Sequence, residues 1–213
     1  MSSPTFDYVR SPDAITRLSF KRIREEAQLD HLPGLMGAVA ERVIHAIASI
    51  EAADHLRFSP DAPERARIAL LGGAPLLVDV EMVSRGITRR FLPTHNEVIC
   101  CLSDEGVGGE AKARGETRSA VGVEHWGDRV QGSVVVIGNA PTALFRLLEL
   151  ILNDGIRPAA ILGFPVGFVG AAESKEALVT HAGDIPFITL TGRLGGSPVA
   201  AAALNAIALG GNP

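Results

Sequence analysis

A histidine with small residues one turn further along is the first candidate for chemistry in this chain. His45 lies in the apolar stretch RVIHAIASIEA, residues 42 to 52, and is followed by Ala48 and Ser49. Because histidine changes charge near neutral pH, His45 could donate a proton into a cavity beside these small residues. The alternative is a histidine at the edge of the core, hydrogen-bonded for example to Ser49, since intermediate burial is ordinary for this residue type.

Arginine and serine side chains add candidate binding groups. Arg42 lies one turn before His45. Arg118 follows a charged, glycine-rich segment, and an arginine can hold a carboxylate through two parallel hydrogen bonds. Its alternative role is an ion pair at the start of a surface helix. Ser19 lies inside the first expected helix, where a hydroxyl that is exposed or bonded to its own backbone is the alternative to a ligand contact.

Acidic residues and glycine turns follow several of the expected strands. Asp79 and Glu81 come after one strand, and glycine-bearing turns follow three others at residues 138–141, 163–167 and 192–197. Ligands of parallel α/β sheets bind at the carboxyl ends of the strands, where backbone N–H groups can hold an anion. Together the turns predict a large ligand with several negative charges, although each alone could be a tight turn that requires glycine.

Motifs for several other chemistries are missing from the chain. It has no G-x-S-x-G nucleophile turn, no H-E-x-x-H zinc motif, no lysine-containing phosphate loop and no strand-linked G-x-G-x-x-G. The remaining histidines lack metal-ligand spacing, so no metal site is expected. These are His31, His55, His95, His125 and His181. The groups that remain suit the binding of a polycarboxylate and the movement of a single proton.

Composition excludes further classes of function. A formal net charge of −4 and a pI near 5.9 give no reason to expect a nucleic-acid partner. The adjacent Cys100 and Cys101 cannot easily form a disulfide with each other, which suits a reducing compartment. The N-terminal residues do not resemble a signal peptide, and no apolar stretch reaches the roughly 20 residues that cross a bilayer. We therefore expect a cytoplasmic protein with no membrane association.

Helical and strand patterns alternate along the chain and predict an α/β fold. Helices are expected at 13–29, 35–53, 63–73, 141–155, 174–182 and 197–209, and strands at 74–80, 97–102, 133–138, 159–163 and 186–190. Continuously apolar strands that alternate with helices predict a three-layer α/β/α architecture with a largely parallel sheet. Residues 1–60 are expected to be mainly helical, 61–213 to alternate, and 1–213 to form a single domain. The charged, glycine-rich segment 103–117 is expected to be a mobile loop.

Several segments of the chain resemble the precorrin-8X methylmutase family. They include RSPDAITRLSFKRIREEA, ERVIHAIASIEA, GAPLLVDVEMVSRGITR, GETRSA, GSVVVIGNAPTALFRLLELI, PAAILGFPVGFVGAAESKEAL and GRLGGSPVAAAALNAIA. The resemblance covers nearly the whole chain, and the blocks GNAPTAL, GFPVGFVGAAESK and GRLGGS are its most specific parts. It implies an isomerase of cobalamin biosynthesis. That enzyme moves a methyl group from C11 to C12 of precorrin-8X and so forms hydrogenobyrinate.

The resemblance also implies the site and the assembly. His45 falls on the family's catalytic histidine in the motif R-x-x-H-A, and Arg42 on the arginine of that motif. Ser19, Thr88 and Arg118 fall on further substrate-binding positions. Members of the family need no cofactor or metal, and they work as homodimers that bind the substrate near the subunit interface. Leu18 separates Arg17 from the serine, which departs from the family pattern, and residues 104–115 match least well.

The residues and the resemblance lead to one mechanistic hypothesis. A tetrapyrrole is apolar on its faces and ringed with carboxylates, so it needs small residues under the ring and anion receptors around the rim. His45 would donate a proton or hydrogen bond to the macrocycle near the end of the methyl migration. Two alternatives stay open: a non-catalytic tetrapyrrole carrier that holds hydrogenobyrinate, and a flavodoxin-like nucleotide-binding domain. The sequence also leaves open whether the substrate carries cobalt.

Overall fold

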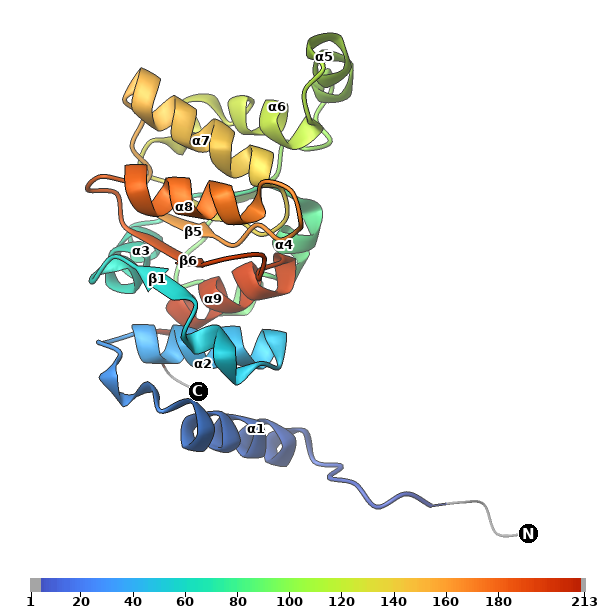
Figure 1. The fold of residues 1–213 in the computed structure, drawn as a ribbon, viewed down its shortest axis with the longest axis vertical. Coiled ribbons are helices and arrows are strands. Elements are labelled where there is room, and N and C mark those ends of the chain that lie inside the picture. Colours follow the sequence, from blue (N-terminus) through green and yellow to red (C-terminus); the bar gives the residue numbers. More distant parts are fainter. Residues whose placement is uncertain (1–4, 212–213) are drawn as a thin grey trace.

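The computed structural model describes residues 5–211, which form a six-stranded sheet between two sets of helices (Figure 1). The strands have the order β1-β6-β5-β4-β2-β3, and neighbours are parallel except for β1 with β6. The strands are β1 Leu56–Phe58, β2 Leu76–Val78, β3 Val98–Ile99, β4 Val134–Ile137, β5 Ala160–Gly163 and β6 Phe187–Leu190. The predicted α/β class with a largely parallel sheet is confirmed.

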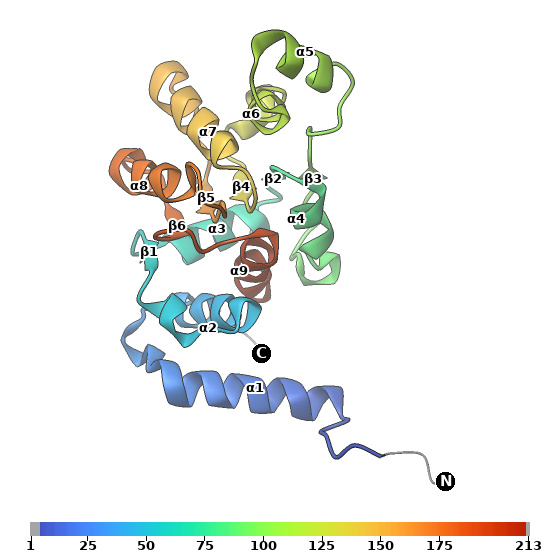
Figure 2. The same ribbon diagram turned by 45° about the vertical axis from the view of Figure 1, so that its right-hand side comes forward.

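Both faces of the sheet are buried under helices. In β4, Val134 and Val136 belong to one apolar core, and Val135 and Ile137 belong to the other. This is the two-residue period of a strand that is covered on both sides. The first core is covered by α3 Ala62–Leu71, α4 Glu81–Gly86 and α9 Ser197–Leu209, and the second by α6 Arg118–Glu124, α7 Pro141–Asp154 and α8 Ala171–His181 (Figures 1 and 2). No helix in the described part of the chain is long and apolar enough to cross a bilayer.

Two N-terminal helices lie outside the layer that contains α9. In Figure 2, α2 (Met36–Ile47) lies between α9 and α1 (Pro12–Ala27), and α1 is the outermost helix. The start of α1 is fixed by Ser11, whose hydroxyl accepts a hydrogen bond of 3.3 Å from the Ala14 N–H. The N-terminal helices therefore present a face of their own, separate from the edges of the sheet.

Some expected elements differ from the structure. Helix α2 ends at Ile47 because Ala48 adopts a left-handed conformation with a φ of 57°, and a short 3-10 helix, η2 (Ile50–Ala53), follows. The expectation of a mobile loop at 103–117 is wrong. Helix α5 (Val107–Arg114) forms there, with Val107 and Ala111 buried against Val121. The edge strand β1 was not expected from the sequence.

Candidate active site

His45 lies on the side of α2 that faces α1. The buried stripe of α2, which contains Val39 and Val43, packs toward α9, so His45 is left off the core and exposed within the single chain. Its imidazole ring stacks on the phenyl ring of Phe20 from α1, with centroids 5.2 Å apart and planes at 23°. The histidine is therefore open to a ligand on one side and covered by an aromatic ring on the other.

A hollow of about 430 Å³ opens beside His45 between α1, α2 and η2. Ser19 and Ala48 line it together with Arg22, Ile23, Glu26, Ile44 and Ile50. Within residues 5–211 His45 forms no hydrogen bond to Ser49, whose hydroxyl donates instead to Glu51 at 2.5 Å. The small side chain of Ala48 leaves the space that the sequence suggested beside the imidazole.

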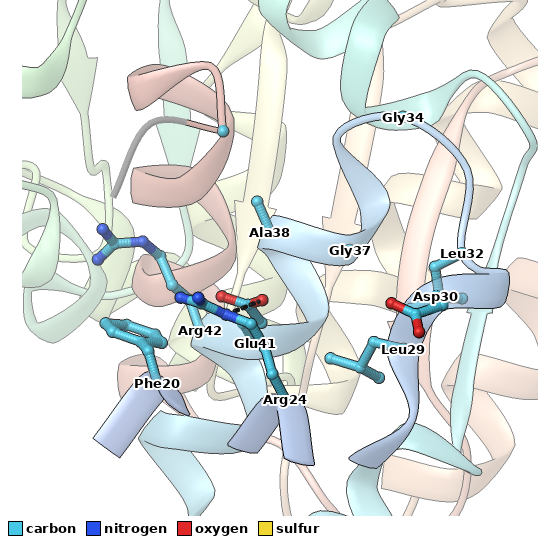
Figure 3. Close-up of a pocket in the computed structure, with 11 residues that line it drawn as sticks. Phe20, Arg24, Leu29, Asp30, Leu32, Gly34, Gly37, Ala38, Glu41 and Arg42 are labelled. Atoms are coloured by element: carbon cyan, nitrogen blue, oxygen red, sulfur yellow. Dashed lines mark hydrogen bonds and ion pairs between the residues drawn. The ribbon is translucent and has the colours of Figure 1, made fainter. Parts of the chain in front are cut away.

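A second hollow of about 570 Å³ lies on the Arg42 side of Phe20 (Figure 3). Arg42 lines it, and the guanidinium carbon of Arg42 lies 5.5 Å from the centroid of the Phe20 ring. Burial lowers the pKa of Arg42, and the nearby Glu41 carboxylate opposes that shift. The Arg24 Nε donates to Glu41 Oε1 at 2.8 Å and so links α1 to α2 across this hollow. Both hollows could receive parts of one large anionic ligand.

Thr88 and Arg118 do not line either hollow. Thr88 precedes the short helix η3 (Arg89–Phe91), and its backbone N–H donates to the Asn205 side chain in α9 at 2.9 Å. Arg118 begins α6 on the opposite face of the sheet and donates to the Leu102 carbonyl at 2.8 Å. Within one chain the fold brings together His45, Ser19 and Arg42, but it leaves Thr88 and Arg118 elsewhere.

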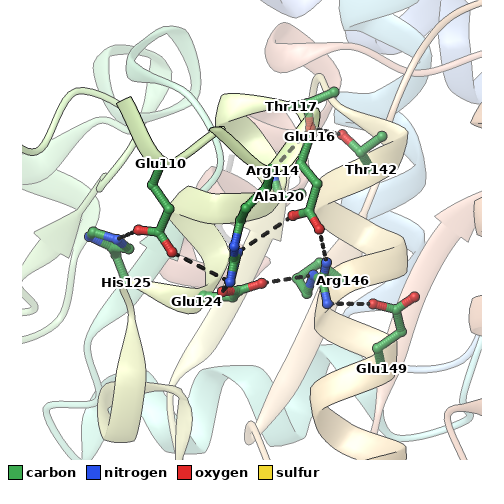
Figure 4. A network of polar contacts seen from close by, with 10 residues as sticks. All are labelled: Glu110, Arg114, Glu116, Thr117, Ala120, Glu124, His125, Thr142, Arg146 and Glu149. Atoms are coloured by element: carbon green, nitrogen blue, oxygen red, sulfur yellow. Dashed lines mark hydrogen bonds and ion pairs between the residues drawn. The ribbon is translucent and has the colours of Figure 1, made fainter. Parts of the chain in front are cut away.

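An ion-pair network surrounds the segment before Arg118 (Figure 4). Arg114 of α5 donates twice to Glu124 Oε2 of α6, at 2.8 and 2.9 Å. Arg146 of α7 contacts Glu116 and Glu124 at 3.1 Å. The His125 ring lies 3.0 Å from a Glu110 oxygen, and this hydrogen bond lowers the pKa of Glu110. These contacts explain why the charged segment is a helix packed on its neighbours rather than a loop.

The turn after β4 is filled by a carboxylate from the same chain. Asp79, which follows β2, accepts hydrogen bonds of 2.9 Å from the N–H groups of Gly138, Asn139 and Ala140. Burial raises the pKa of Asp79, while the three amide donors favour the charged form. The expectation that this glycine turn holds a ligand anion is therefore wrong, since Asp79 occupies its donors.

The other two glycine turns are hydrogen-bonded to each other. The Gly196 N–H donates to the Phe164 carbonyl at 2.8 Å. A Cβ on Gly195 would lie 2.4 Å from that same oxygen, so glycine is required there by close packing. Lys175 of α8 is buried, and its ammonium donates to the Leu194 carbonyl at 2.5 Å. Burial lowers the pKa of Lys175 to about 8.

Thiol and metal chemistry find no support in the described residues. Burial raises the pKa of both Cys100 and Cys101 to about 11, which disfavours a nucleophilic thiolate. Within residues 5–211, no three His, Cys, Asp or Glu side chains gather closely enough to hold a metal ion. His95 is exposed in the segment before β3.

Sequence reasoning missed the contacts of two residues. Phe20 follows Ser19 directly, and its apolar character within an amphipathic helix gave no sign that it would stack on His45. Lys175 lies in the pattern SKEALVTHA, where a lysine is normally solvated. In both cases the partner lies on another element, so only the packing of the fold shows the contact.

Comparison with known proteins identifies the family. The family model described as precorrin-8X methylmutase matches residues 14–209. The chain belongs to the precorrin-8X methylmutase family. It is 52% identical to the precorrin-8X methylmutase of Pseudomonas aeruginosa, across 95% of this chain and 97% of that protein. It is 51% identical to that of a Sinorhizobium species, across 96% and 98%.

More distant members of the methylmutase family agree in sequence and in fold. The cobalt-precorrin-8 methylmutase of Priestia megaterium is 38% identical, over 93% of this chain and 88% of that protein. The crystal structure of precorrin-8X methylmutase from Thermus thermophilus superposes with a TM-score of 0.83 at 38% identity, over 92% of this chain and 94% of that chain. The methylmutase resemblance and the α/β fold inferred from the sequence are thus confirmed.

Proposed function

We propose that this chain is an isomerase of cobalamin biosynthesis that moves a methyl group from C11 to C12 of precorrin-8X and forms hydrogenobyrinate. Family membership across nearly the full length carries this proposal. The site geometry supports it, because His45 and Ser19 line one hollow and Arg42 lines the next. The reaction breaks the C11–methyl bond and forms the C12–methyl bond, and the composition of the macrocycle stays the same.

In the proposed mechanism His45 acts as a general acid. Its ring is exposed at the hollow, so it can reach a macrocycle that is seated there. A proton or hydrogen bond from His45 would stabilise the charge that develops as the methyl group migrates. Because the product is an isomer of the substrate, the proton returns to His45 at the end of the cycle. Arg42, Ser19, Thr88 and Arg118 are proposed to bind the carboxylates and the ring edge.

A homodimer is part of the proposal. Thr88 and Arg118 lie away from the His45 hollow within one chain, so a second copy is a reasonable source of these groups. The N-terminal arm and α1 also expose several large apolar side chains, as expected of a surface that a partner covers. These are Phe6, Tyr8, Val9, Ile15 and Leu18. We further propose that residues 1–213 act as one domain and that the enzyme is cytoplasmic.

The metal-free macrocycle is the proposed substrate. The two relatives with 51% and 52% identity are named precorrin-8X methylmutases. Six relatives at 34% to 41% are named cobalt-precorrin-8 methylmutases, although the Thermus thermophilus structure at 38% also carries the precorrin-8X name. We expect faster turnover with precorrin-8X than with its cobalt complex, measured side by side at equal concentrations. Equal or faster turnover of the cobalt complex would contradict this choice.

The decisive experiment follows the absorption spectrum after precorrin-8X is added to the wild-type protein and to His45→Ala. The wild type should convert the substrate into hydrogenobyrinate. His45→Ala should still bind but react about 10²- to 10⁴-fold more slowly, which is the usual contribution of a positioned acid. Turnover by His45→Ala close to that of the wild type would reject the acid role. If the wild type binds the macrocycle and returns it unchanged, the protein is a carrier instead.

A further inference from the structure

Among residues 5–211 the His45 ring has no polar partner to hold its orientation. Three other histidines in the described chain have a ring nitrogen in a hydrogen bond: His31 with Gln28, His55 with Thr191 and His125 with Glu110. Within residues 5–211, His45 has no such bond. A catalytic histidine is usually oriented by a carboxylate or a backbone carbonyl on its second nitrogen. In this fold something other than a hydrogen bond must orient the ring.

Phe20 is the group that contacts the ring. The two rings are stacked at 5.2 Å between centroids and 23° between planes. This lies in the range of favourable aromatic pairs, which gain from offset stacking beyond the area they bury. A histidine ring on an exposed helix face otherwise rotates over a broad range of its second torsion angle. The stack restricts that rotation and leaves both ring nitrogens free for a ligand.

Phe20 is itself well fixed. It is 8% exposed and belongs to the core that contains Ile23, Val43 and Ile44. One turn further along α1, Arg24 donates to Glu41 of α2 at 2.8 Å. This ion pair lies one turn before His45 on α2 and keeps the two helices in register. The Phe20 ring thus has little freedom to leave the imidazole.

Phe20 also links the two hollows. It lines the hollow of Arg42, whose guanidinium carbon lies 5.5 Å from its centroid, and it stacks on the histidine that lines the other. Arg42 and His45 are three residues apart on α2, so one phenyl ring can contact both. A change at Phe20 is therefore expected to act on KM through Arg42 and on kcat through His45, so the two constants are measured separately.

We propose that Phe20 is a positioning residue for the methyl transfer, which orients His45 toward the substrate through a stack that replaces the usual hydrogen bond. The proposal rests on the proposed acid role of His45. Phe20 makes no proton transfer itself. Its contribution is to keep the imidazole in the orientation that points a ring N–H into the hollow shared with Ser19.

The test compares Phe20→Leu with Phe20→Tyr. Phe20→Leu keeps an apolar side chain but removes the stack, so kcat should fall between about 2- and 13-fold, as expected for loss of an aromatic pair. Phe20→Tyr keeps the ring and should restore kcat to within about twofold of the wild type. The matched control is Phe58→Leu, since Phe58 is a half-buried phenylalanine of β1 that packs on the same core without touching His45. It should lower the melting temperature and leave kcat unchanged.

A double-mutant cycle separates positioning from general damage. If Phe20 acts through His45, Phe20→Leu should have no further effect on residual turnover in the His45→Ala background. An equal fold-change in both backgrounds would overturn the proposal, and so would a kcat for Phe20→Leu as high as that for Phe58→Leu. If the residual turnover of His45→Ala is too low to measure, recovery of kcat in Phe20→Tyr separates positioning by the ring from general damage.

A measurement on the free protein distinguishes failure of this proposal from failure of the acid role. The carbon-bound protons of the His45 ring should show the shift caused by the aromatic ring above them, and this shift should disappear in Phe20→Leu and persist in Phe20→Tyr. Identical His45 resonances in the wild type and Phe20→Leu would overturn the stack in solution. If the stack is present but His45→Ala turns over normally, the acid role fails, and with it the catalytic importance of Phe20.

Discussion

Two regions of the molecule carry candidate ligand-binding polar residues. They differ in whether these residues bond to one another or face an open hollow. At the carboxyl edge of the sheet the polar groups satisfy each other: Asp79 occupies the amides after β4, and Lys175 donates to the carbonyl of Leu194. On the N-terminal helices, His45 and Ser19 face an open hollow and have no side-chain hydrogen bond within residues 5–211. Glycine turns at a sheet edge therefore indicate a ligand site only when their amide groups are free.

This comparison predicts that the sheet edge tolerates substitution poorly. Asp79→Asn should reduce the free energy of unfolding by about 3 kcal/mol, because an amide cannot accept from three buried N–H groups as a carboxylate does. Denaturant unfolding followed by circular dichroism measures this change. The control is Asp30→Asn at the exposed rim of the Arg42 hollow, which should change stability by less than about 0.5 kcal/mol. Similar losses in both variants would remove the distinction between the two regions.

The sheet edge should also leave a signature in the pH dependence of stability. Burial lowers the pKa of Lys175 to about 8 from the 10.5 of an exposed lysine. Between these two pH values the unfolded chain binds more protons than the folded chain, so the stability of the native state rises with pH in this window. Relative to Lys175→Met, the wild type should gain on the order of 1 to 3 kcal/mol from pH 8 to 10.5.

The control for that titration is Lys112→Met, at an exposed lysine of α5. Its stability should run parallel to that of the wild type over the whole range. If the unfolding free energies of the wild type and Lys175→Met changed equally with pH, the Lys175 ammonium would not be desolvated. Unfolding free energies at four or five pH values, with all three proteins in the same buffers, would decide between these outcomes.

The sequence predicts the elements that local signals determine and misses those that depend on contacts with distant parts of the chain. Strand β4 and helix α7 were predicted closely, because an apolar run and a Pro–Gly pair of boundaries are local signals. Helix α5 was missed because its helical state depends on Val121 and on the ion pair of Arg114 with Glu124 of α6. Strand β1 was missed because its three residues pair with β6, far along the chain.

The candidate site also contains features that local spacing predicts and features that depend on distant residues. The type and spacing of His45 and Ala48 indicated a cavity beside the imidazole as one of two alternatives, because helical spacing alone relates these residues. The role of the turn after β4 could not be predicted, since the carboxylate that fills it is 59 residues away in the sequence. The function assigned to Thr88 rests on the family resemblance, that of Arg118 on its position and on the resemblance, and both stay predictions.

Arg118 tests whether the site extends beyond the N-terminal helices. Arg118→Ala should weaken substrate binding about tenfold, the effect of losing one charge-assisted hydrogen bond to a carboxylate. Stability should change little because the side chain is exposed. Titration of the protein with hydrogenobyrinate measures the dissociation constant, with Arg65→Ala on the exposed side of α3 as the control. A normal dissociation constant for Arg118→Ala would limit Arg118 to its contact with the Leu102 carbonyl.

The smallest expected effect compares two serines, one from each region. Ser19→Ala removes a hydroxyl that lines the His45 hollow, so stability should stay within about 0.5 kcal/mol while KM rises a few-fold. Ser174→Ala removes a fully buried hydroxyl of α8 that donates to the Ala171 carbonyl at 3.1 Å, next to Lys175. It should cost about 1 kcal/mol of stability and leave KM unchanged. If Ser19→Ala lost stability and kept its KM, Ser19 would contribute to packing and not to substrate binding. The two regions would then not differ in the way that this comparison states.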